Sequence, residues 1–302
     1  MLADFQLLRN ESLAKYTAAR LGGPADFLYV ARDSNEHLSE VVRAAWREGI
    51  PVRVLGGGAN VLISDAGFRG LVVINRVSKA AFHEATGTVA NTVTVTAGTS
   101  LTILARKCAS KGLAGFEWAV SVPGTVGGAV VNNAGAHGGD MASCLRSAVL
   151  VDAEHGTQML TNADLAYAYR SSSLKGRPDR RFLVMMATLN LTSDHPAAIN
   201  ARMEEFITHR KRTQPPGASL GSIFKNPPGD YAGRLIEVCG LKGAQIGAAQ
   251  VSPIHANFFI NTGDATATDY FRLIERVREA VHEQTGVLLE TEVECIGEGF
   301  MS

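Results

Sequence analysis

Two glycine-rich stretches constrain this chain more than any other feature. The first is GGGANVL at residues 56–62, and the second is VPGTVGGA at residues 122–129. Glycine lets the backbone adopt positive φ and approach a ligand closely, and successive exposed backbone N–H groups form a concave site for anions. Two such stretches predict a ligand with two linked phosphates and a large body, such as a dinucleotide cofactor.

The first stretch does not match two common nucleotide-binding loops. It reads GGGANV rather than G-x-G-x-x-G at the start of a helix, and the chain has no P-loop Gly-Lys-Ser/Thr sequence. Residues 65–70 (DAGFRG) follow it and predict a turn into the next strand. A triple glycine is also compatible with a tight turn that binds nothing, so this stretch alone leaves the function open.

The composition indicates an ordinary globular protein with a sizeable core. The chain has 302 residues, 46% of them hydrophobic, and Lys plus Arg (29) equals Asp plus Glu (29). This balance predicts neither a nucleic-acid nor a membrane-surface partner. The apolar run at 182–191 is too short to span a bilayer, and the N-terminus is charged too early for a secretory signal. We therefore expect a cytoplasmic protein.

The cysteines give no sign of a metal or redox motif. The chain contains four widely separated cysteines and no C-x-x-C pair. We expect reduced, mostly structural thiols and no metal site. The residues concerned are Cys108, Cys144, Cys239 and Cys295.

The order of predicted elements indicates an α+β chain with three parts. The expected strands are 26–31, 52–55, 71–74, 92–97, 148–151, 183–189, 257–261 and 288–296. The expected helices are 34–48, 100–111, 197–211, 231–238 and 268–285. The order of predicted helices and strands changes near residues 76 and 195. We therefore expect three parts, covering residues 1–76, 77–195 and 196–302.

A series of motifs in one order resembles the UDP-N-acetylenolpyruvoylglucosamine reductase family. Besides the glycine stretches, they are KYT (15–17), GGPAD (22–26), YRSS (169–172), GSIFKNP (221–227), HANF (255–258) and EV (292–293). The likeness extends from residue 13 to 298. The glycine stretches alone would indicate only the wider vanillyl-alcohol-oxidase-type FAD superfamily, whereas GSIFKNP is much more specific.

The resemblance implies a fold and a reaction. The fold is of the vanillyl-alcohol-oxidase/PCMH type, in which two α/β subdomains (1–76 and 77–195) bind FAD non-covalently and a C-terminal domain (196–302) binds substrate. The reaction is the NADPH-dependent reduction of UDP-N-acetylglucosamine enolpyruvate to UDP-N-acetylmuramate for peptidoglycan. The short segment between Arg212 and Gly240 is similar to the family's shorter type, without a tyrosine-bearing insertion.

Three residues match the family's catalytic positions. Arg170 is implied to bind the substrate carboxylate, because a guanidinium stays cationic and binds carboxylates bidentately. Ser222 matches the proton donor, and Glu292 matches a glutamate that assists proton delivery. Taken alone, each has an ordinary interpretation: a surface arginine after a strand, a turn serine, and one carboxylate of an acidic strand.

The resemblance also implies binding residues. For FAD they are Gly56, Gly57, Gly58, Ala59, Asn60 and Val61 from the first stretch, and Gly124, Thr125, Val126, Gly128 and Ala129 from the second. For the substrate they are Tyr169, Lys225 and Asn226. His137 is interpreted as a polar loop residue rather than a point of covalent FAD attachment, and His255 as structural.

Two other functions stay open at this point. One is a related FAD oxidase or dehydrogenase acting on an alcohol or a sugar lactone, which would not need residues 221–227. The other is a nucleotide-sugar-binding module without redox chemistry, which would not need Arg170, Ser222 and Glu292. The chain also departs from the family pattern at Leu220, Glu294 and His137, which puts finer substrate contacts in doubt.

Overall fold

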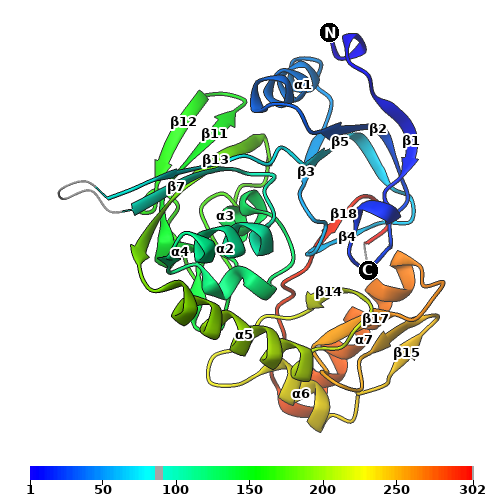
Figure 1. Cartoon of the computed structure of the whole chain (residues 1–302). Helices are drawn as coiled ribbons and strands as arrows, with labels where there is room; N and C mark the ends of the chain where they lie inside the picture. Colours follow the sequence, from blue (N-terminus) through cyan, green and yellow to red (C-terminus); the bar gives the residue numbers. More distant parts are fainter. Residues whose placement is uncertain (86–90, 301–302) are drawn as a thin grey trace. The chain divides into compact units, whose positions relative to one another are not determined.

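The structure is a computed structural model that describes residues 1–85 and 91–300 (Figure 1). It divides into two compact units. The first unit is Met1–Leu7, Tyr29–Gly57 and Leu71–Arg210, and the second is Leu8–Leu28, Gly58–Gly70 and Lys211–Ser302. The finer division at residues 76 and 195 stays a prediction.

The N-terminal part of the chain forms a four-stranded sheet. Its strand order is β1-β2-β5-β3, formed by β1 (Leu8–Ser12), β2 (Pro24–Ala31), β5 (Phe68–Asn75) and β3 (Val52–Leu55). β3 and β5 are parallel, and α1 (Asn35–Arg47) connects β2 to β3. The Ser34 side chain accepts a hydrogen bond from the His37 N–H and so caps α1. The short 3-10 turns are η1 (Leu2–Asp4) and η2 (Ala14–Tyr16).

The first unit also contains an antiparallel sheet in the order β12-β11-β13-β7-β6, with β8 paired to β13. Its strands are β6 (Ala80–His83), β7 (Asn91–Thr96), β8 (Leu113–Ala114), β11 (Leu145–Asp152), β12 (Gly156–Thr161) and β13 (Phe182–Ser193). Alternation in the sequence NTVTVT places Val93 and Val95 in the core of this unit.

Short helices and a hairpin complete the first unit. They are α2 (Leu101–Ser110), η3 (Glu117–Ser121), α3 (Val126–Asn132), α4 (Met141–Cys144) and α5 (Pro196–Thr213), with β9 (Gly135–Ala136) paired to β10 (Gly139–Asp140). α5 runs three residues into the second unit. Val126 and Ala129 of α3 are buried in the same core as Leu104 and Phe116.

The second unit has its own sheet and core. The strand order is β14-β17-β16-β15, formed by β14 (Ala218–Ser222), β17 (Phe258–Asn261), β16 (Ala249–Val251) and β15 (Gln245–Ile246). Two helices, α6 (Ala232–Val238) and α7 (Ala267–Thr285), belong to this unit. β4 (Val61–Ile63) pairs in parallel with β18 (Glu294–Ile296), which ties the Gly58–Gly70 segment of the unit to its C-terminal segment.

The long α7 forms as its sequence predicts. Leu273, Ile274, Val277 and Val281 make one buried stripe. The Thr266 side chain and Asp269 form a capping box at the N-terminus. Gly286 ends the helix in the left-handed conformation, at φ 73°.

Two sequence predictions need correction. The expected strand 288–296 is only Glu294–Ile296, because Thr291 makes just an isolated bridge to Phe224. The second glycine stretch is not a loop throughout, since its residues from Val126 onward form α3. All five expected helices are present, each within one or two residues of its predicted ends.

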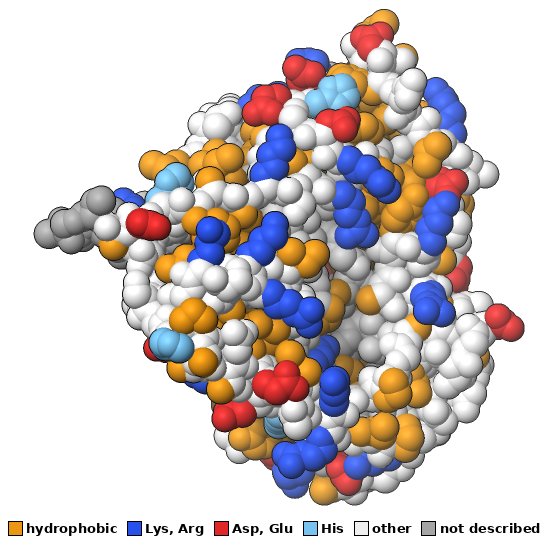
Figure 2. All heavy atoms as spheres, viewed as in Figure 1, with side chains coloured by type: hydrophobic (Ala, Val, Ile, Leu, Met, Phe, Trp, Pro, Cys, Tyr) orange, Lys and Arg blue, Asp and Glu red, His pale blue; other side chains and the backbone are white. Residues whose placement is uncertain are grey.

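The surface and the cysteines match the composition. Acidic and basic side chains are interspersed with hydrophobic ones on the face drawn in Figure 2. Within residues 1–85 and 91–300, no helix combines the length and apolar character needed to cross a membrane. The four cysteines are free, and burial raises the pKa of Cys108 and Cys144 to about 12, so both thiols stay protonated at neutral pH.

Candidate active site

The two glycine stretches meet in the first unit. Gly56 directly follows β3, and a Cβ atom there would lie 2.0 Å from the Thr125 Oγ1. A Cβ atom on Gly57 would lie 3.1 Å from the Gly124 Cα. The backbone of Gly56 therefore packs against the Thr125 side chain, and the backbone of Gly57 packs against that of Gly124. A side chain at position 56 would displace Thr125, and one at position 57 would crowd Gly124.

The second stretch is fixed by hydrogen bonds to the loop between β7 and α2. The Val126 N–H donates to the Thr99 carbonyl (2.9 Å), and the Gly127 N–H donates to the Ala97 carbonyl (2.8 Å). Thr125 is the N-cap residue of α3 and is 5% exposed. These N–H groups hold the loop in place and are not available to a phosphate.

Other positions in the second stretch suit a bound cofactor. Gly124 has φ +125° and no atom within 4 Å of a Cβ position, and the Gly128 Cβ position meets only Thr125 Oγ1 at 3.9 Å. Together with Gly56 and Gly57 they form a surface of backbone without side chains. This surface fits a phosphate-bearing ligand, whereas the side chains of Val126 and Ala129 point into the core.

The rest of the first stretch lies in the second unit. Its residues are Gly58, Ala59, Asn60 and Val61. Gly58 has φ +60° and a Cβ there would lie 2.1 Å from the Tyr16 carbonyl oxygen. The Asn60 Nδ2 donates to the Glu292 carbonyl (3.1 Å), and the Glu294 N–H donates to the Asn60 carbonyl (3.1 Å). Asn60 thereby joins the predicted cofactor loop to the segment that carries Glu292.

Arg170 lies at a tight turn of the first unit. Ala168 and Ser171 exchange backbone hydrogen bonds of 3.2 and 3.1 Å across the turn, and Arg170 has φ 54°. Its Nη2 donates to the Gly135 carbonyl (2.7 Å) and its Nη1 to the Asn133 carbonyl (3.5 Å). The guanidinium is thus oriented by the backbone that follows α3.

The side chains that flank Arg170 in the sequence differ in exposure. Tyr169 is 54% exposed, and the Arg170 Cζ lies 5.2 Å from its ring centroid. Ser172 is buried and its Oγ donates to the Val131 carbonyl. The Lys175 Nζ donates to the Arg170 carbonyl (3.2 Å). Within the YRSS motif, Tyr169 is exposed, Arg170 and Ser171 are half-buried, and Ser172 is buried.

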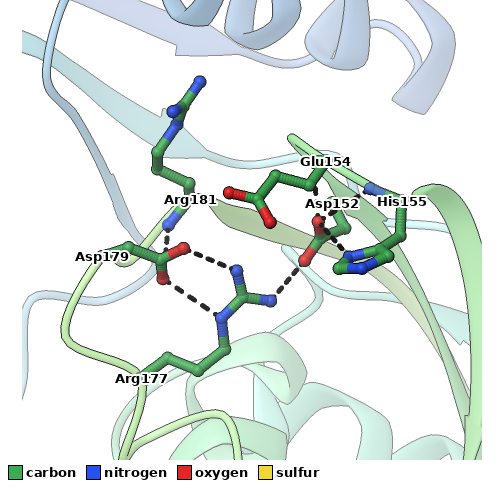
Figure 3. A network of polar contacts seen from close by, with 6 residues as sticks. All are labelled: Asp152, Glu154, His155, Arg177, Asp179 and Arg181. Carbon is green, nitrogen blue, oxygen red and sulfur yellow. Dashed lines mark hydrogen bonds and ion pairs between the residues drawn. The ribbon is translucent and has the colours of Figure 1, made fainter.

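A polar network fixes the far end of the segment that carries Arg170 (Figure 3). Arg177 donates to the fully buried Asp152 and to Asp179. The N–H groups of Glu154 (2.9 Å) and His155 (3.1 Å) also donate to Asp152 Oδ1. Burial alone would raise the pKa of Asp152, but these hydrogen bonds outweigh burial and hold that pKa well below its ordinary value.

Ser222 is placed by strand pairing in the second unit. It is the last residue of β14 and lies opposite Phe258 of β17. An irregularity in the register between Ser219 and Ser222 contains Gly221, at φ +77°. The next residue, Ile223, donates its N–H to the Asn257 carbonyl (2.9 Å). The main chain therefore determines where the serine lies.

Glu292 lies on a segment bonded directly to that of Ser222. The Glu292 N–H donates to the Ile223 carbonyl (2.8 Å). Because Ile223 directly follows Ser222, the backbone of Glu292 is bonded to the residue next to the serine. Glu292 lies two residues before β18 rather than at the start of the last strand. Of the three predicted catalytic residues, the structure brings Ser222 and Glu292 together within one unit.

The two predicted substrate residues after Ser222 have different settings. The Lys225 Nζ forms an ion pair with Glu290 at 2.5 Å, and the side chains are 16% and 71% exposed. Asn226 is exposed, and its Oδ1 accepts the Ala232 N–H (3.1 Å) at the start of α6. The Asn226 side chain is thus held at the end of a helix.

Sequence reasoning missed two buried asparagines beside these sites. Asn257 (3% exposed) accepts the Phe224 N–H with Oδ1 (2.9 Å) and donates to the Phe224 carbonyl with Nδ2 (2.8 Å). Asn133 (4% exposed) contacts the Arg170 turn. Asn257 lies in the HANF motif and Asn133 follows the second glycine stretch, but a sequence does not show which asparagines turn inward.

The two histidines have structural contacts. The His137 ring stacks on Phe206 at 4.3 Å between centroids and lies within hydrogen-bond distance of Ser121 Oγ (3.2 Å). Burial, followed by nearby His209 and Arg210, lowers the pKa of His137. The Nδ1 of His255 accepts the Asn257 N–H (3.2 Å).

Comparisons with known proteins agree with these features. Residues 28–161 match the FAD binding domain, and residues 212–296 match the C-terminal domain of UDP-N-acetylenolpyruvoylglucosamine reductase. The crystal structure of the reductase from Thermus caldophilus superposes with a TM-score of 0.81 and 34% identity, covering 97% of this chain and 99% of that one. The predicted α+β, PCMH-type fold is confirmed.

Curated relatives match along nearly the whole chain. UDP-N-acetylenolpyruvoylglucosamine reductase 2 of Symbiobacterium thermophilum is 44% identical over 97% of this chain and 92% of its own length. The reductase of Moorella thermoacetica is 45% identical over 97% of this chain and 94% of its own. The chain therefore belongs to the UDP-N-acetylenolpyruvoylglucosamine reductase family of FAD-dependent oxidoreductases.

Proposed function

We propose that this chain reduces UDP-N-acetylglucosamine enolpyruvate to UDP-N-acetylmuramate with NADPH, in the synthesis of peptidoglycan precursors. One hydride is added to C3 of the enolpyruvyl group and one proton to C2, and NADPH is oxidised to NADP⁺. The family match over the whole chain supports this reaction, as do the intact Arg170, Ser222 and Glu292.

Bound FAD would supply the redox chemistry that connects NADPH oxidation to reduction of the enolpyruvyl group. The residues that hold it are the backbone groups of Gly56, Gly57, Gly124 and Gly128, where side chains are absent and the backbone is approachable. The family resemblance also implies that Gly58, Ala59, Asn60 and Val61 bind FAD, and we assign them this role. Thr125, Val126 and Ala129 support the site by fixing α3: Thr125 is its N-cap residue, and the side chains of Val126 and Ala129 pack in the core.

Arg170 binds the substrate carboxylate. Negative charge grows on the carboxylate and C2 as hydride reaches C3, and a fixed cation stabilises that charge more than it stabilises the substrate. The carbonyls of Asn133 and Gly135 hold the guanidinium in one orientation. Orientation fixed before substrate binding lowers the cost of reaching the transition state.

Ser222 donates the proton to C2, and Glu292 assists it. A serine hydroxyl is a weak acid, so it acts once negative charge has built up on C2. The hydrogen bond between the Glu292 N–H and the Ile223 carbonyl keeps a carboxyl group on the segment beside the serine. From there Glu292 orients a water molecule or returns a proton to the serine.

Tyr169, Lys225 and Asn226 bind other parts of the substrate. Lys225 supplies positive charge for the diphosphate, and Asn226 supplies an amide for the uridine. The exposed Tyr169 ring provides an apolar face beside Arg170. These assignments, like the cytoplasmic location and the absence of a nucleic-acid partner, stay predictions.

The juxtaposition of Ser222 and Glu292 on bonded segments carries the choice of this reaction over the alternatives. An oxidase acting on an alcohol or a sugar lactone has no use for a proton donor built on residues 221–227. A binding module without redox chemistry has no use for FAD. The proposed reaction uses both features.

The test is a steady-state assay of the purified, FAD-loaded protein. NADPH consumption is measured with and without the enolpyruvyl UDP sugar, and oxygen consumption is measured separately in air with a simple sugar lactone or alcohol and no NADPH. We expect consumption only with the enolpyruvyl substrate and formation of UDP-N-acetylmuramate by mass spectrometry. Fast oxygen-dependent turnover of the alcohol or lactone would instead support the oxidase.

A further inference from the structure

The turn that bears Arg170 is strained and needs outside support. Arg170 has φ 54°, a left-handed conformation that is unfavourable for a residue with a Cβ atom. The hydrogen bonds between Ala168 and Ser171 close the turn, but they do not fix its position against the rest of the unit. Something must therefore hold the turn where the guanidinium meets its carbonyl partners.

The buried side chain of Asn133 makes that connection. Its Nδ2 donates to the Ala168 carbonyl (3.0 Å) and approaches Asp140 Oδ2 at 3.4 Å. Its Oδ1 accepts the Ala142 N–H (3.0 Å). One side chain thus links α3, the start of α4 and the turn of Arg170.

The backbone of Asn133 serves the same arginine. Asn133 ends α3 in the left-handed conformation, with φ 45° and ψ 57°, which asparagine tolerates better than most residues. Its carbonyl accepts a hydrogen bond from Arg170 Nη1. Asn133 therefore acts on Arg170 in two ways: its side chain bonds the turn that carries the arginine, and its carbonyl accepts a hydrogen bond from the guanidinium.

Only an amide satisfies all these partners at once. The Ala142 N–H requires an acceptor, whereas the Ala168 carbonyl and the Asp140 carboxylate require donors. A carboxylate at position 133 would place an oxygen against two other oxygens in a buried site. The pattern of donors and acceptors thus selects asparagine independently of the backbone conformation.

We propose that Asn133 is a positioning residue for Arg170 in the reduction of the enolpyruvyl substrate. The inference rests on the proposed function and adds to it a residue that touches neither substrate nor cofactor. The network of Asp152 and Arg177 anchors the other end of the same segment (Figure 3). Loss of the Asn133 amide therefore shifts the arginine without releasing the whole segment.

The test separates the two half-reactions in Asn133→Asp and Asn133→Gly. Glycine keeps the left-handed backbone and removes only the side chain. We expect anaerobic reoxidation of the reduced flavin by the enolpyruvyl substrate to slow about 10- to 100-fold, and the Kd of that substrate for the oxidised protein to rise. Reduction of the flavin by NADPH should change less than about twofold.

Asn162→Asp is the matched control. Asn162 also donates from Nδ2 to two backbone carbonyls, those of Ala142 (2.7 Å) and Leu145 (3.0 Å), but none of these bonds reaches the Arg170 turn. Its substitution should leave the ratio of the two half-reaction rates unchanged. If Asn162→Asp lowered the reoxidation rate relative to the reduction rate as much as the Asn133 variants do, the effect would come from a general loss of rigidity in the unit. That result would overturn the proposal.

A double-mutant cycle with Arg170→Met gives the decisive readout. If Asn133 acts through Arg170, Asn133→Gly should add no further slowing in the Arg170→Met background. Additive losses would overturn the proposal, as would failure of both Asn133 variants to fold. Absence of substrate-dependent turnover in the unmodified protein would instead contradict the proposed function, so the two failures are distinguishable.

Discussion

Arg170 and Ser222, one in each unit, are held in place in contrasting ways. Ser222 ends a strand, and main-chain hydrogen bonds join its segment to those of Asn257 and Glu292. Arg170 lies on a left-handed turn outside any strand, and the Asn133 side chain connects that turn to its surroundings.

This difference predicts how each position responds to mutation. A ladder of backbone hydrogen bonds does not depend on any one side chain. Substitutions near Ser222 should therefore lower the stability of the unit more than they displace the serine. The turn of Arg170 is held by individual side chains, among them those of Asn133 and Ser172. Such a turn can move when one side chain is changed while the unit stays folded, so changes near Arg170 should affect catalysis before stability. The predictions below test this contrast.

The largest effect is expected for Ser222→Ala. Loss of the proton donor should slow flavin reoxidation by the enolpyruvyl substrate about 10³-fold, with NADPH-dependent flavin reduction nearly unchanged. Stopped-flow absorbance measures both steps. Ser219→Ala, on the same strand, is the control and should behave as the unmodified protein. Equal slowing of both steps would assign Ser222 to folding or binding.

Asn257→Asp should act mainly on stability. A carboxylate would face the buried Phe224 carbonyl in place of the Nδ2 donor, which should lower the free energy of unfolding by about 3 kcal/mol. Urea unfolding followed by circular dichroism measures the change. Per folded molecule, the reoxidation rate should stay within about threefold. A tenfold loss of that rate with stability unchanged would show that Asn257, like Asn133, acts on catalysis, and would contradict the prediction that the two asparagines differ.

Asp152→Asn should lower stability in a pH-dependent way. Its folded-state pKa lies well below the ordinary value of 3.8, so the carboxylate stabilises the protein above that value and loses its contribution as pH falls towards the folded-state pKa. Removing this buried partner of Arg177 should cost about 3 kcal/mol near neutral pH. The difference from the unmodified protein should shrink below about pH 4.

Asp179→Asn is the matched control, because Asp179 pairs with the same arginine but is 36% exposed. Its loss should cost less than about 1 kcal/mol. The free energy of unfolding of each variant is measured by denaturant unfolding between about pH 3 and pH 7, the range over which an aspartate titrates in the unfolded chain. Equal losses would show that burial of Asp152 does not matter.

The smallest effect is expected for Glu290→Gln. Glu290 is 71% exposed and pairs with Lys225, so the bond itself contributes little. Releasing the lysine should lower the KM for the UDP substrate about twofold at low salt, with the difference vanishing at high salt. A raised KM would indicate that the pair positions Lys225 instead of competing with the diphosphate.

Local sequence signals predicted most helices and many strands. α7 followed from its apolar stripe and Gly286, and α1 from Ser34, because periodicity and caps act over a few residues. The parallel pairing of β4 with β18 was not predictable in this way. It joins residues 61–63 to 294–296, and no local pattern encodes a partner so far along the chain.

The candidate site divides along the same line. Motifs identified Arg170, Ser222 and Glu292, but Asn133 and Asn257 emerged only from tertiary contacts. Whether an asparagine turns inward depends on which carbonyls and N–H groups the fold brings beside it. The role of the glycine stretches in binding FAD stays a prediction, and the helix that begins at Val126 depends on packing against the core.

An anaerobic single-turnover measurement tests the central claim most directly. The FAD-loaded protein is reduced with one equivalent of NADPH and then mixed with UDP-N-acetylglucosamine enolpyruvate, while the absorbance of oxidised flavin is followed. The account predicts that this absorbance returns fully in the unmodified protein, with one UDP-N-acetylmuramate formed per flavin, and that Ser222→Ala recovers about 10³-fold more slowly. Recovery at the same rate in both proteins, or none in the unmodified protein, would contradict the account.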